Sequence, residues 1–263
     1  MKLVIAEKPS VAISIAKVIG ANKKKDGYYE GNGYRVSWCV GHLIQMANPD
    51  AYDEKYAKWN MADLPIIPSD YKYEVAKATK KQFNILKKLM NDKEIDMVIN
   101  ACDAGREGES IFRLVYNQVN CRKKMKRLWI SSMEDSAIKE GFDNLTDGKD
   151  YDNLFESAQA RAIADWLVGM NISRLYSCLY QQNYSVGRVQ TPTLAMIVKR
   201  DDEIANFKKE KYYTVELSTN GFTLSTDRID DEVAAEQLLS LVGDKFEITD
   251  VIQKEKITKP DLP

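Results

Sequence analysis

The chain of 263 residues is long enough for one large domain or two ordinary ones, each with a buried core. Hydrophobic residues make up 44% of it and charged residues 29%, which is typical of a folded globular protein and excludes a disordered one. The net charge of −1 excludes nucleic-acid binding driven by overall basicity, so any such binding depends on local patches.

Other features narrow the class further. No apolar run approaches the roughly 18–20 residues of a membrane helix, and the amino terminus lacks the layout of a signal peptide. The four cysteines are widely spaced, which argues against a zinc ribbon or a disulfide framework and favours reduced thiols in the cytoplasm. The one histidine, His42, excludes a histidine-rich metal site. Its expected role is structural, and a proton carrier bordering a site is the alternative.

The first predicted unit is a buried strand over residues 2–6, followed by a helix whose apolar stripe stops at Gly20. Ser10 comes just after a proline and is predicted to cap this helix. Glu7 and Lys8 therefore lie at the carboxyl end of a strand. Their default roles are a solvated loop acid and a surface cation.

Strand-like and helix-like segments alternate to about residue 150. Strands are predicted over residues 34–40, 96–101 and 127–130. Helices are predicted over residues 79–90 and over residues 134–145, the latter capped by Ser132. This alternation predicts an α/β domain with a largely parallel sheet over residues 1–150.

The turn after the strand at residues 96–101 carries three acids. The segment reads Ile99-Asn-Ala-Cys-Asp-Ala-Gly-Arg-Glu-Gly-Glu-Ser110 and sets Asp103, Glu107 and Glu109 close together. Open α/β folds bind ligands at the carboxyl ends of parallel strands, and crowded carboxylates suit Mg²⁺. Two such units in one sheet would bring Glu7 towards these acids. A carboxylate cluster with an adjacent lysine is suited to binding a metal and a phosphodiester together. The alternative is a helix start whose acids complement the helix dipole.

From about residue 152 the pattern changes to helices alone, predicted over residues 154–179 and 193–207 with a polar break between them. From residue 211, strand-like runs flank Asn220-Gly221, a strong hairpin signal, and a further strand is predicted over residues 246–252. We therefore expect an all-helical domain over residues 151–210 and a small β-rich segment over residues 211–263.

Cations and aromatic side chains in the helical segment are candidates for binding DNA. Arginine grips phosphates through a planar fork, and tryptophan stacks on unpaired bases. The candidates are Arg161, Trp166, Arg174, Arg188 and Lys199. The alternatives are surface salt bridges for the arginines and core packing for the tryptophan. The basic run over residues 122–127 is another candidate, with a solvated turn as its alternative.

Six motifs occur together and in order along the chain. They are Glu7-Lys-Pro-Ser10, Gly41-His-Leu43, Trp59-Asn-Met-Ala-Asp-Leu-Pro65, Asp103-Ala-Gly-Arg-Glu-Gly-Glu109, Ala164-Asp-Trp-Leu-Val-Gly169 and Ser185-Val-Gly-Arg-Val-Gln-Thr-Pro192. With these motifs the chain resembles the amino-terminal part of a type IA DNA topoisomerase, closest to the bacterial topoisomerase III branch. The resemblance covers essentially the whole chain. It implies a Rossmann-like Toprim domain, then a helical domain and the start of a β-rich arch.

The resemblance also implies a reaction. A tyrosine attacks single-stranded DNA and forms a 5′-phosphotyrosyl link, another strand passes through the gap, and the break is resealed without ATP. Glu7 matches a general acid or metal ligand, and Lys8 matches its companion at the scissile phosphate. Asp103 and Glu107 match the outer acids of a D-x-D-x-E motif that holds Mg²⁺. The implied DNA contacts are Trp59, Arg161, Trp166, Arg174, Ser185, Val186, Gly187, Arg188, Val189 and Gln190.

In the last of these motifs, the backbone amides at the helix start are expected to hold a phosphate, with Arg188 and Gln190 as side-chain donors.

Two departures from the family pattern matter. The middle acid of the motif falls at Gly105, so we expect a weaker Mg²⁺ site, made by Glu7 and Asp103 with Glu107. Glu109 is either a substitute ligand or an ordinary acid of the first helical turn. None of the 14 tyrosines has the tyrosine-proline-arginine-threonine context of the family's nucleophile. We therefore expect an inactive amino-terminal fragment of a nucleoid-associated protein.

Two other functions stay open. One is another Toprim enzyme, such as a nuclease or primase, against which the motif over residues 185–192 speaks. The other is a DNA-binding module without catalysis, which the glycine at position 105 supports. The G-x-G-x-x-G and G-x-x-x-x-G-K-S/T patterns are both missing, so nucleotide-binding dehydrogenases and P-loop kinases fit poorly. The oligomeric state and any partner helicase are left open.

Overall fold

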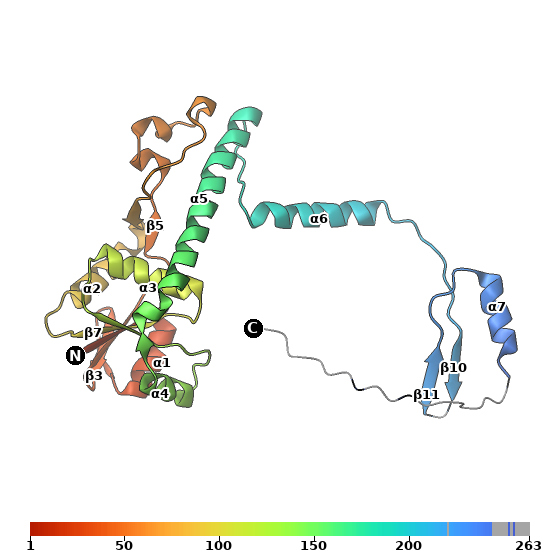
Figure 1. The fold of residues 1–263 in the computed structure, drawn as a ribbon, viewed down its shortest axis with the longest axis horizontal. Helices are drawn as coiled ribbons and strands as arrows, with labels where there is room; N and C mark the ends of the chain where they lie inside the picture. Colours follow the sequence, from red (N-terminus) through yellow and green to blue (C-terminus); the bar gives the residue numbers. More distant parts are fainter. Residues whose placement is uncertain (220, 244–251, 253–254, 256–263) are drawn as a thin grey trace. The chain divides into compact units, whose positions relative to one another are not determined.

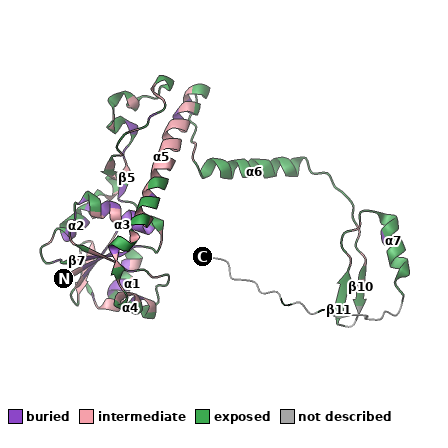
Figure 2. Ribbon diagram, in the orientation of Figure 1, coloured by how far each residue is buried: buried purple, intermediate pink, exposed green. Residues whose placement is uncertain are grey.

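The computed structural model describes residues 1–219, 221–243, 252 and 255. The chain divides into two compact units, Met1–Ala195 and Met196–Pro263, and each is described by itself. The first unit holds most of the buried residues, as Figure 2 shows. Within the described residues, no helix combines the length and the apolar character needed to span a membrane. The strand predicted over residues 246–252 lies outside the described part, apart from residue 252 itself.

A mixed sheet forms the frame of the first unit (Figure 1). Among the described residues it has seven strands in the order β2-β3-β4-β1-β7-β8-β9. Their bounds are β1 Lys2–Ala6, β2 Lys23–Lys25, β3 Tyr28–Gly31, β4 Tyr34–Trp38, β7 Met97–Ala101, β8 Lys124–Arg127 and β9 Thr146–Asp147. Strands β4, β1, β7 and β8 run parallel, and the strands outside them pair antiparallel. The predicted α/β fold with a largely parallel sheet is confirmed.

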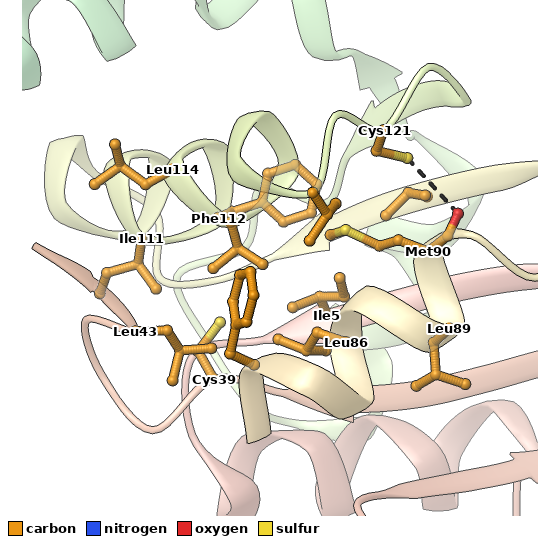
Figure 3. Close-up of a cluster of buried hydrophobic side chains, with 14 of the residues drawn as sticks. Ile5, Cys39, Leu43, Leu86, Leu89, Met90, Ile111, Phe112, Leu114 and Cys121 are labelled. Carbon is orange, nitrogen blue, oxygen red and sulfur yellow. Dashed lines mark hydrogen bonds between the residues drawn. The ribbon is translucent and has the colours of Figure 1, made fainter. Parts of the chain in front are cut away.

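Helices cover both faces of this sheet. They are α1 Pro9–Ile19, α2 Lys80–Met90, α3 Arg106–Gln118 and α4 Asp135–Asp143. Successive side chains of β1 point to opposite faces, as in any strand. Leu3 and Ile5 join a cluster with Phe112 and other residues of α2 and α3 (Figure 3). Val4 joins the cluster formed with α1 and α4, which includes Ile138. The continuous apolar run of β1 is thus explained by burial on both faces.

An excursion between β4 and α2 runs beside the long helix α5, Asp152–Tyr180 (Figure 1). Its elements are β5 Ile44–Met46, η1 Pro49–Ala51, η2 Glu54–Ala57, η3 Met61–Asp63, β6 Tyr73–Val75 and η4 Lys77–Thr79. The side-chain amide of Asn171 on α5 donates to the carbonyl of Ile66 at 3.0 Å and accepts from the N–H of Ile66 at 2.6 Å. These paired bonds fix the excursion to the helix.

Helix α5 is followed by a polar break and then by α6, Gln190–Ala205, which begins three residues before the predicted start. In the second unit, β10 Glu216–Thr219 pairs antiparallel with β11 Phe222–Ser225, which confirms the pairing predicted for the strands that flank Asn220-Gly221; Asn220 itself lies outside the described residues. Helix α7, Glu232–Leu241, is capped by Asp231, whose carboxylate accepts from the N–H of Ala234.

Both predicted capping residues are wrong. Helix α1 begins at Pro9 with Lys8 as its N-cap, because proline fits the first helical turn, so Ser10 lies inside the helix. Ser132 precedes the N-cap of α4, which is Glu134, and its hydroxyl accepts from the N–H of that residue.

The strand predicted over residues 127–130 lies at Lys124–Arg127 instead. It pairs with β7 up to Asn100 opposite Arg127, and there the ladder ends. Past this point Trp129 stacks on Tyr151, with ring centroids 5.0 Å apart. The basic run over residues 122–127 is therefore largely a strand, and its last side chain is buried.

Candidate active site

Parallel pairing of β1 with β7 brings the two predicted turns together. Ala6 lies opposite Ala101, so the residues that follow each strand leave the sheet at the same edge. The Nζ of Lys8 lies 3.7 Å from Oε1 of Glu7 and 3.9 Å from Oδ2 of Asp103. The fold thus brings these three side chains into one cluster. Its lysine is more than half exposed, with 58% of the side chain accessible.

Glu107 has a different partner. Its Oε2 lies 3.2 Å from Nε2 of His42, which follows β4 in the loop at the same edge of the sheet. Both side chains are exposed, at 68% for Glu107 and 48% for His42. The histidine, whose expected role was structural, borders the acidic turn.

The predicted magnesium ligands are chemically suitable but are not arranged as a preassembled site. Within the described residues, no three His, Cys, Asp or Glu side chains lie close enough together to hold a metal ion. Carboxylate oxygens suit Mg²⁺. However, the ammonium of Lys8 lies between Glu7 and Asp103, and Glu107 faces His42. The cation that balances the first two acids in this structure is the lysine.

Gly105 stands where the motif's middle acid is expected. Its backbone is extended, with φ 171°, a conformation that any residue adopts. A Cβ added at this position would meet no atom within 4 Å. The turn therefore has room for a third carboxylate and lacks one.

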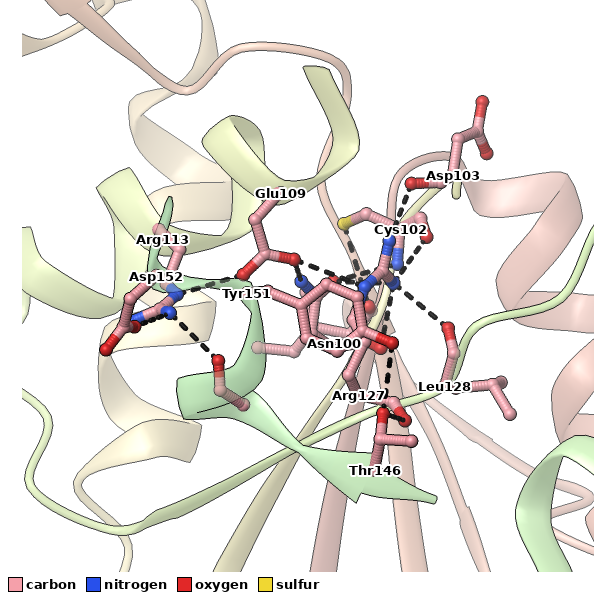
Figure 4. A network of polar contacts seen from close by, with 12 residues as sticks. Asn100, Cys102, Asp103, Glu109, Arg113, Arg127, Leu128, Thr146, Tyr151 and Asp152 are labelled. Carbon is pink, nitrogen blue, oxygen red and sulfur yellow. Dashed lines mark hydrogen bonds and ion pairs between the residues drawn. The ribbon is translucent and has the colours of Figure 1, made fainter. Parts of the chain in front are cut away.

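Glu109 is a structural acid and not a substitute ligand. Its side chain is 1% exposed. It accepts hydrogen bonds from Nε of Arg113 at 2.9 Å and from Nδ2 of Asn100 at 2.8 Å (Figure 4). Its Oε2 also lies 3.2 Å from Nε of Arg127. Burial lowers the pKa of the Arg127 guanidinium, and the negative charge of Glu109 opposes that shift.

Trp166 belongs to the core between α5 and the excursion. It is 6% exposed, and its Nε1 donates to the carbonyl of Ala47 at 3.0 Å. Tyr52 and Tyr71 pack against the indole edge to face. This environment matches the alternative of core packing, and stacking of DNA on Trp166 stays a prediction.

Arg174 is likewise buried, at 5% exposed, and its contact with a phosphate stays a prediction. Its Nη1 donates to the carbonyl of Tyr56 at 2.8 Å. Burial lowers its pKa, and Asp50 is the main acid that opposes the shift. Its guanidinium lies 5.3 Å from the ring centroid of Trp59, which is 47% exposed. The buried cation thus supports an aromatic ring that remains accessible.

An open pocket of about 710 Å³ adjoins this ring. Most of its lining side chains carry polar groups, and four of them are amides. The lining includes Trp59, Asn60, Ser177, Gln181, Gln182 and Asn183.

Arg161 and Arg188 converge on one carboxylate, that of Asp165. Nη1 of Arg188 lies 2.8 Å from Oδ1, and Nε of Arg161 lies 3.7 Å from Oδ2. Each arginine side chain is 43% exposed, so both remain accessible from solvent while paired. In this structure both arginines form surface salt bridges, which was the alternative to DNA binding.

The motif over residues 185–192 is anchored to its neighbours. The N–H of Val186 donates to Ser173 at 2.9 Å, and that of Gly187 donates to Thr191 at 3.1 Å. These two amides thus have partners within the chain, and their binding to a phosphate stays a prediction. Gln190 donates to the Ser185 hydroxyl at 2.9 Å, and Val189 is exposed.

These features define an α/β protein with an acidic turn and a lysine at the carboxyl edge of its parallel strands. Residues 2–133 match the family described as Toprim domain, and residues 149–263 match the family described as DNA topoisomerase. The chain belongs to the Toprim-containing type IA DNA topoisomerases.

Individual relatives agree with this assignment. DNA topoisomerase 3 of Bacillus thuringiensis (strain Al Hakam) is 51% identical over 217 residues, which are 82% of this chain and 30% of the relative. DNA topoisomerase 3 of Bacillus subtilis (strain 168) is 48% identical over 223 residues, 85% of this chain and 31% of the relative. The chain thus spans under a third of the length of these relatives.

A solved structure shows the same fold. Full-length topoisomerase I from Thermotoga maritima superposes with a TM-score of 0.60 and 24% identity. The match covers 91% of this chain and 37% of the other.

The close packing of α3 under the acidic turn generates a prediction. A Cβ at Gly108 would lie 2.1 Å from the carbonyl oxygen of Asp103, whereas one at Gly105 would meet open space. We expect Gly108→Ala to lower the free energy of unfolding by roughly 1–3 kcal/mol, because backbone must move. Gly105→Ala, the matched control, should stay within about 0.5 kcal/mol of the wild type. Urea unfolding followed by circular dichroism measures both, and equal losses would contradict the packing argument.

Proposed function

We propose that this chain is the part of a type IA DNA topoisomerase that binds single-stranded DNA and Mg²⁺ for transient cleavage of one strand, passage of another and resealing. The observation that carries the proposal is the cluster of Lys8 with Glu7 and Asp103 at the carboxyl edge of the parallel strands. Open α/β folds bind phosphate-bearing ligands at this edge.

The charges of the cluster suggest how it meets a phosphodiester. Lys8 is exposed and carries the positive charge that a scissile phosphate would pair with. When Lys8 turns to the phosphate, Glu7 and Asp103 lose their cation and repel each other. A Mg²⁺ ion held by these two carboxylates, with Glu107, would restore the balance and supply positive charge beside the phosphate. In this proposal metal binding follows DNA binding.

Glu7 is the candidate proton carrier of the cluster. Its side chain is only 12% exposed, in contrast to the open carboxylates of Asp103 and Glu107. As the alternative to its role as a metal ligand, a protonated Glu7 next to a lysine that holds the phosphate would give its proton to the oxygen that leaves.

The DNA strand is proposed to follow α5 towards the pocket beside Trp59. The half-exposed ring, supported by Arg174, offers a stacking surface for an unpaired base. Arg161 and Arg188 would exchange their shared carboxylate for phosphates. Relatives that are DNA topoisomerases support DNA, and hence the nucleoid in the cytoplasm, as the place of action.

A DNA-binding module without catalysis is the second candidate. The glycine at position 105 and the lysine seated between two acids favour it. A Toprim nuclease or primase is disfavoured, because residues 149–263 match the DNA topoisomerase family. Metal binding separates the two remaining candidates.

Mg²⁺ affinity tests the acidic cluster. Calorimetric titration of the chain with a bound oligonucleotide should show Mg²⁺ binding that Asp103→Ala weakens by roughly tenfold or more. Gly105→Asp should strengthen it, because the added carboxylate enters open space. Asp26→Ala, which removes an exposed acid near α2, is the control and should change nothing. Equal affinity in Asp103→Ala and wild type would exclude this site, and an absence of binding would favour the module without catalysis.

DNA affinity tests the stacking surface. Fluorescence anisotropy with a labelled single strand should show Trp59→Ala weakening binding by about 1–3 kcal/mol without a change in salt dependence. Arg188→Ala should instead reduce the slope of log affinity against log salt by about 0.7, because one phosphate contact is lost. Phe207→Ala, which removes an aromatic ring that is 72% exposed, is the control. Full affinity in Trp59→Ala would remove the ring from the interface.

The expected lack of the nucleophile has its own test. None of the tyrosines has the family's context, so the purified chain with Mg²⁺ should leave a supercoiled plasmid unrelaxed. Agarose-gel electrophoresis after incubation measures this. Relaxation by the chain alone would show that a nucleophile lies within these residues.

A further inference from the structure

Arg127, the last residue of β8, lies buried beneath the acidic turn with 1% of its side chain exposed (Figure 4). Its Nη1 donates to the carbonyls of Cys102 at 2.7 Å, Leu128 at 3.0 Å and Asn100 at 3.1 Å. Its Nη2 donates to the carbonyl of Asp103 at 2.7 Å. One side chain therefore binds the backbone at the end of β7, in the acidic turn and just after β8.

The carbonyls of Cys102 and Asp103 need such a donor because the strand ladder stops short of them, whereas the carbonyl of Asn100 also accepts from the N–H of Leu128 at 2.9 Å. The pairing of β7 with β8 ends at Asn100 opposite Arg127. The chain of the turn then runs on as Cys102 and Asp103, and on that side no strand of the described residues pairs with them. A buried carbonyl left without a partner costs free energy comparable to a lost hydrogen bond. A planar guanidinium with several fixed donors meets this need in a way that a single ammonium does not.

The other end of the turn is held through the counter-ion. Glu109 lies in the first turn of α3, and its Oε2 is 3.2 Å from Nε of Arg127. The same carboxylate accepts from Asn100 and from Arg113. Arg127 thus holds both ends of the segment from Asp103 to the start of α3. It donates to the carbonyl of Asp103 at one end and pairs with Glu109 at the other.

Aromatic rings restrict the guanidinium further. Its central carbon lies 4.9 Å from the ring centroid of Trp129 and 5.9 Å from that of Tyr151. The two rings also stack on each other. Cation–π contact with these rings limits the directions in which Arg127 can point.

A buried pair of charges is a costly way to stabilise a protein, because both charges lose their hydration on burial. Well-packed apolar residues often stabilise the same site as much. We propose that Arg127, with Glu109 as its counter-ion, is a positioning residue that sets the place of Asp103 relative to Lys8 and Glu7. It touches no reacting atom and acts only through the backbone of the turn. Its consequence for DNA and Mg²⁺ binding rests on the proposed function, whereas its effect on the turn does not.

Hydrogen exchange of the full chain tests the positioning directly. Arg127→Lys keeps the charge but loses the fork, so amide exchange over residues 102–108 should rise by roughly tenfold or more. The control is Arg35→Lys, because Arg35 is also nearly buried and pairs with Glu30, Asp92 and Glu94. Arg35 lies near the amino end of β4, opposite Leu3, whereas the turn follows the carboxyl end of β7. It should lower stability without a local rise at residues 102–108.

Binding measurements on the same variants complete the test. Arg127→Lys and Glu109→Gln should both weaken Mg²⁺ binding in the presence of an oligonucleotide, while Arg35→Lys should not. Unchanged exchange over residues 102–108 in Arg127→Lys, or an equal rise in Arg35→Lys, would overturn the positioning role. A wild-type chain that binds neither DNA nor Mg²⁺ would contradict the proposed function, and the exchange result would still decide the role of Arg127.

Discussion

The parallel pairing of β1 with β7 is the constraint on which the rest of the site depends. It places Ala6 opposite Ala101, so that two turns from distant parts of the sequence leave the sheet side by side. Without this register Lys8 would not reach Asp103, and there would be no cluster of charge at the edge. Burial of both faces of β1 holds the register, because a shift by one residue would exchange the side chains of the two core clusters.

Two groups of opposite charges lie at that edge of the sheet, one near the surface and one buried. At the surface, the ammonium of Lys8 lies within 4 Å of two acids, Glu7 and Asp103, and more than half of the lysine side chain is exposed. Below it, Arg127 and Glu109 form a buried pair that cannot move without leaving a charge uncompensated. In the proposed function, the three outer residues exchange partners while the buried pair keeps the backbone of the turn in place.

The long helix α5 follows the same division between fixed and accessible groups. Its buried residues Trp166 and Arg174 both bond to backbone carbonyls of the excursion, and they hold that segment against the helix. Arg174 thereby presents Trp59 at the surface. The residues available to a partner are therefore the outer ones, and the buried ones determine where those lie.

Local pattern was enough to predict the elements with strong periodicity, the paired strands on either side of Asn220-Gly221, and the two strand-turn-helix units whose turns carry Glu7 and Asp103. Which polar residues are buried became known from the folded chain alone. The sequence leaves Glu109 as either a metal ligand or a first-turn acid, and the structure pairs it with Arg127 from another strand. It leaves Trp166 as either a core residue or a stacking ring, and the structure buries it with its N–H bonded to Ala47. Burial and partnership arise from residues far apart in the chain, and local spacing does not encode them.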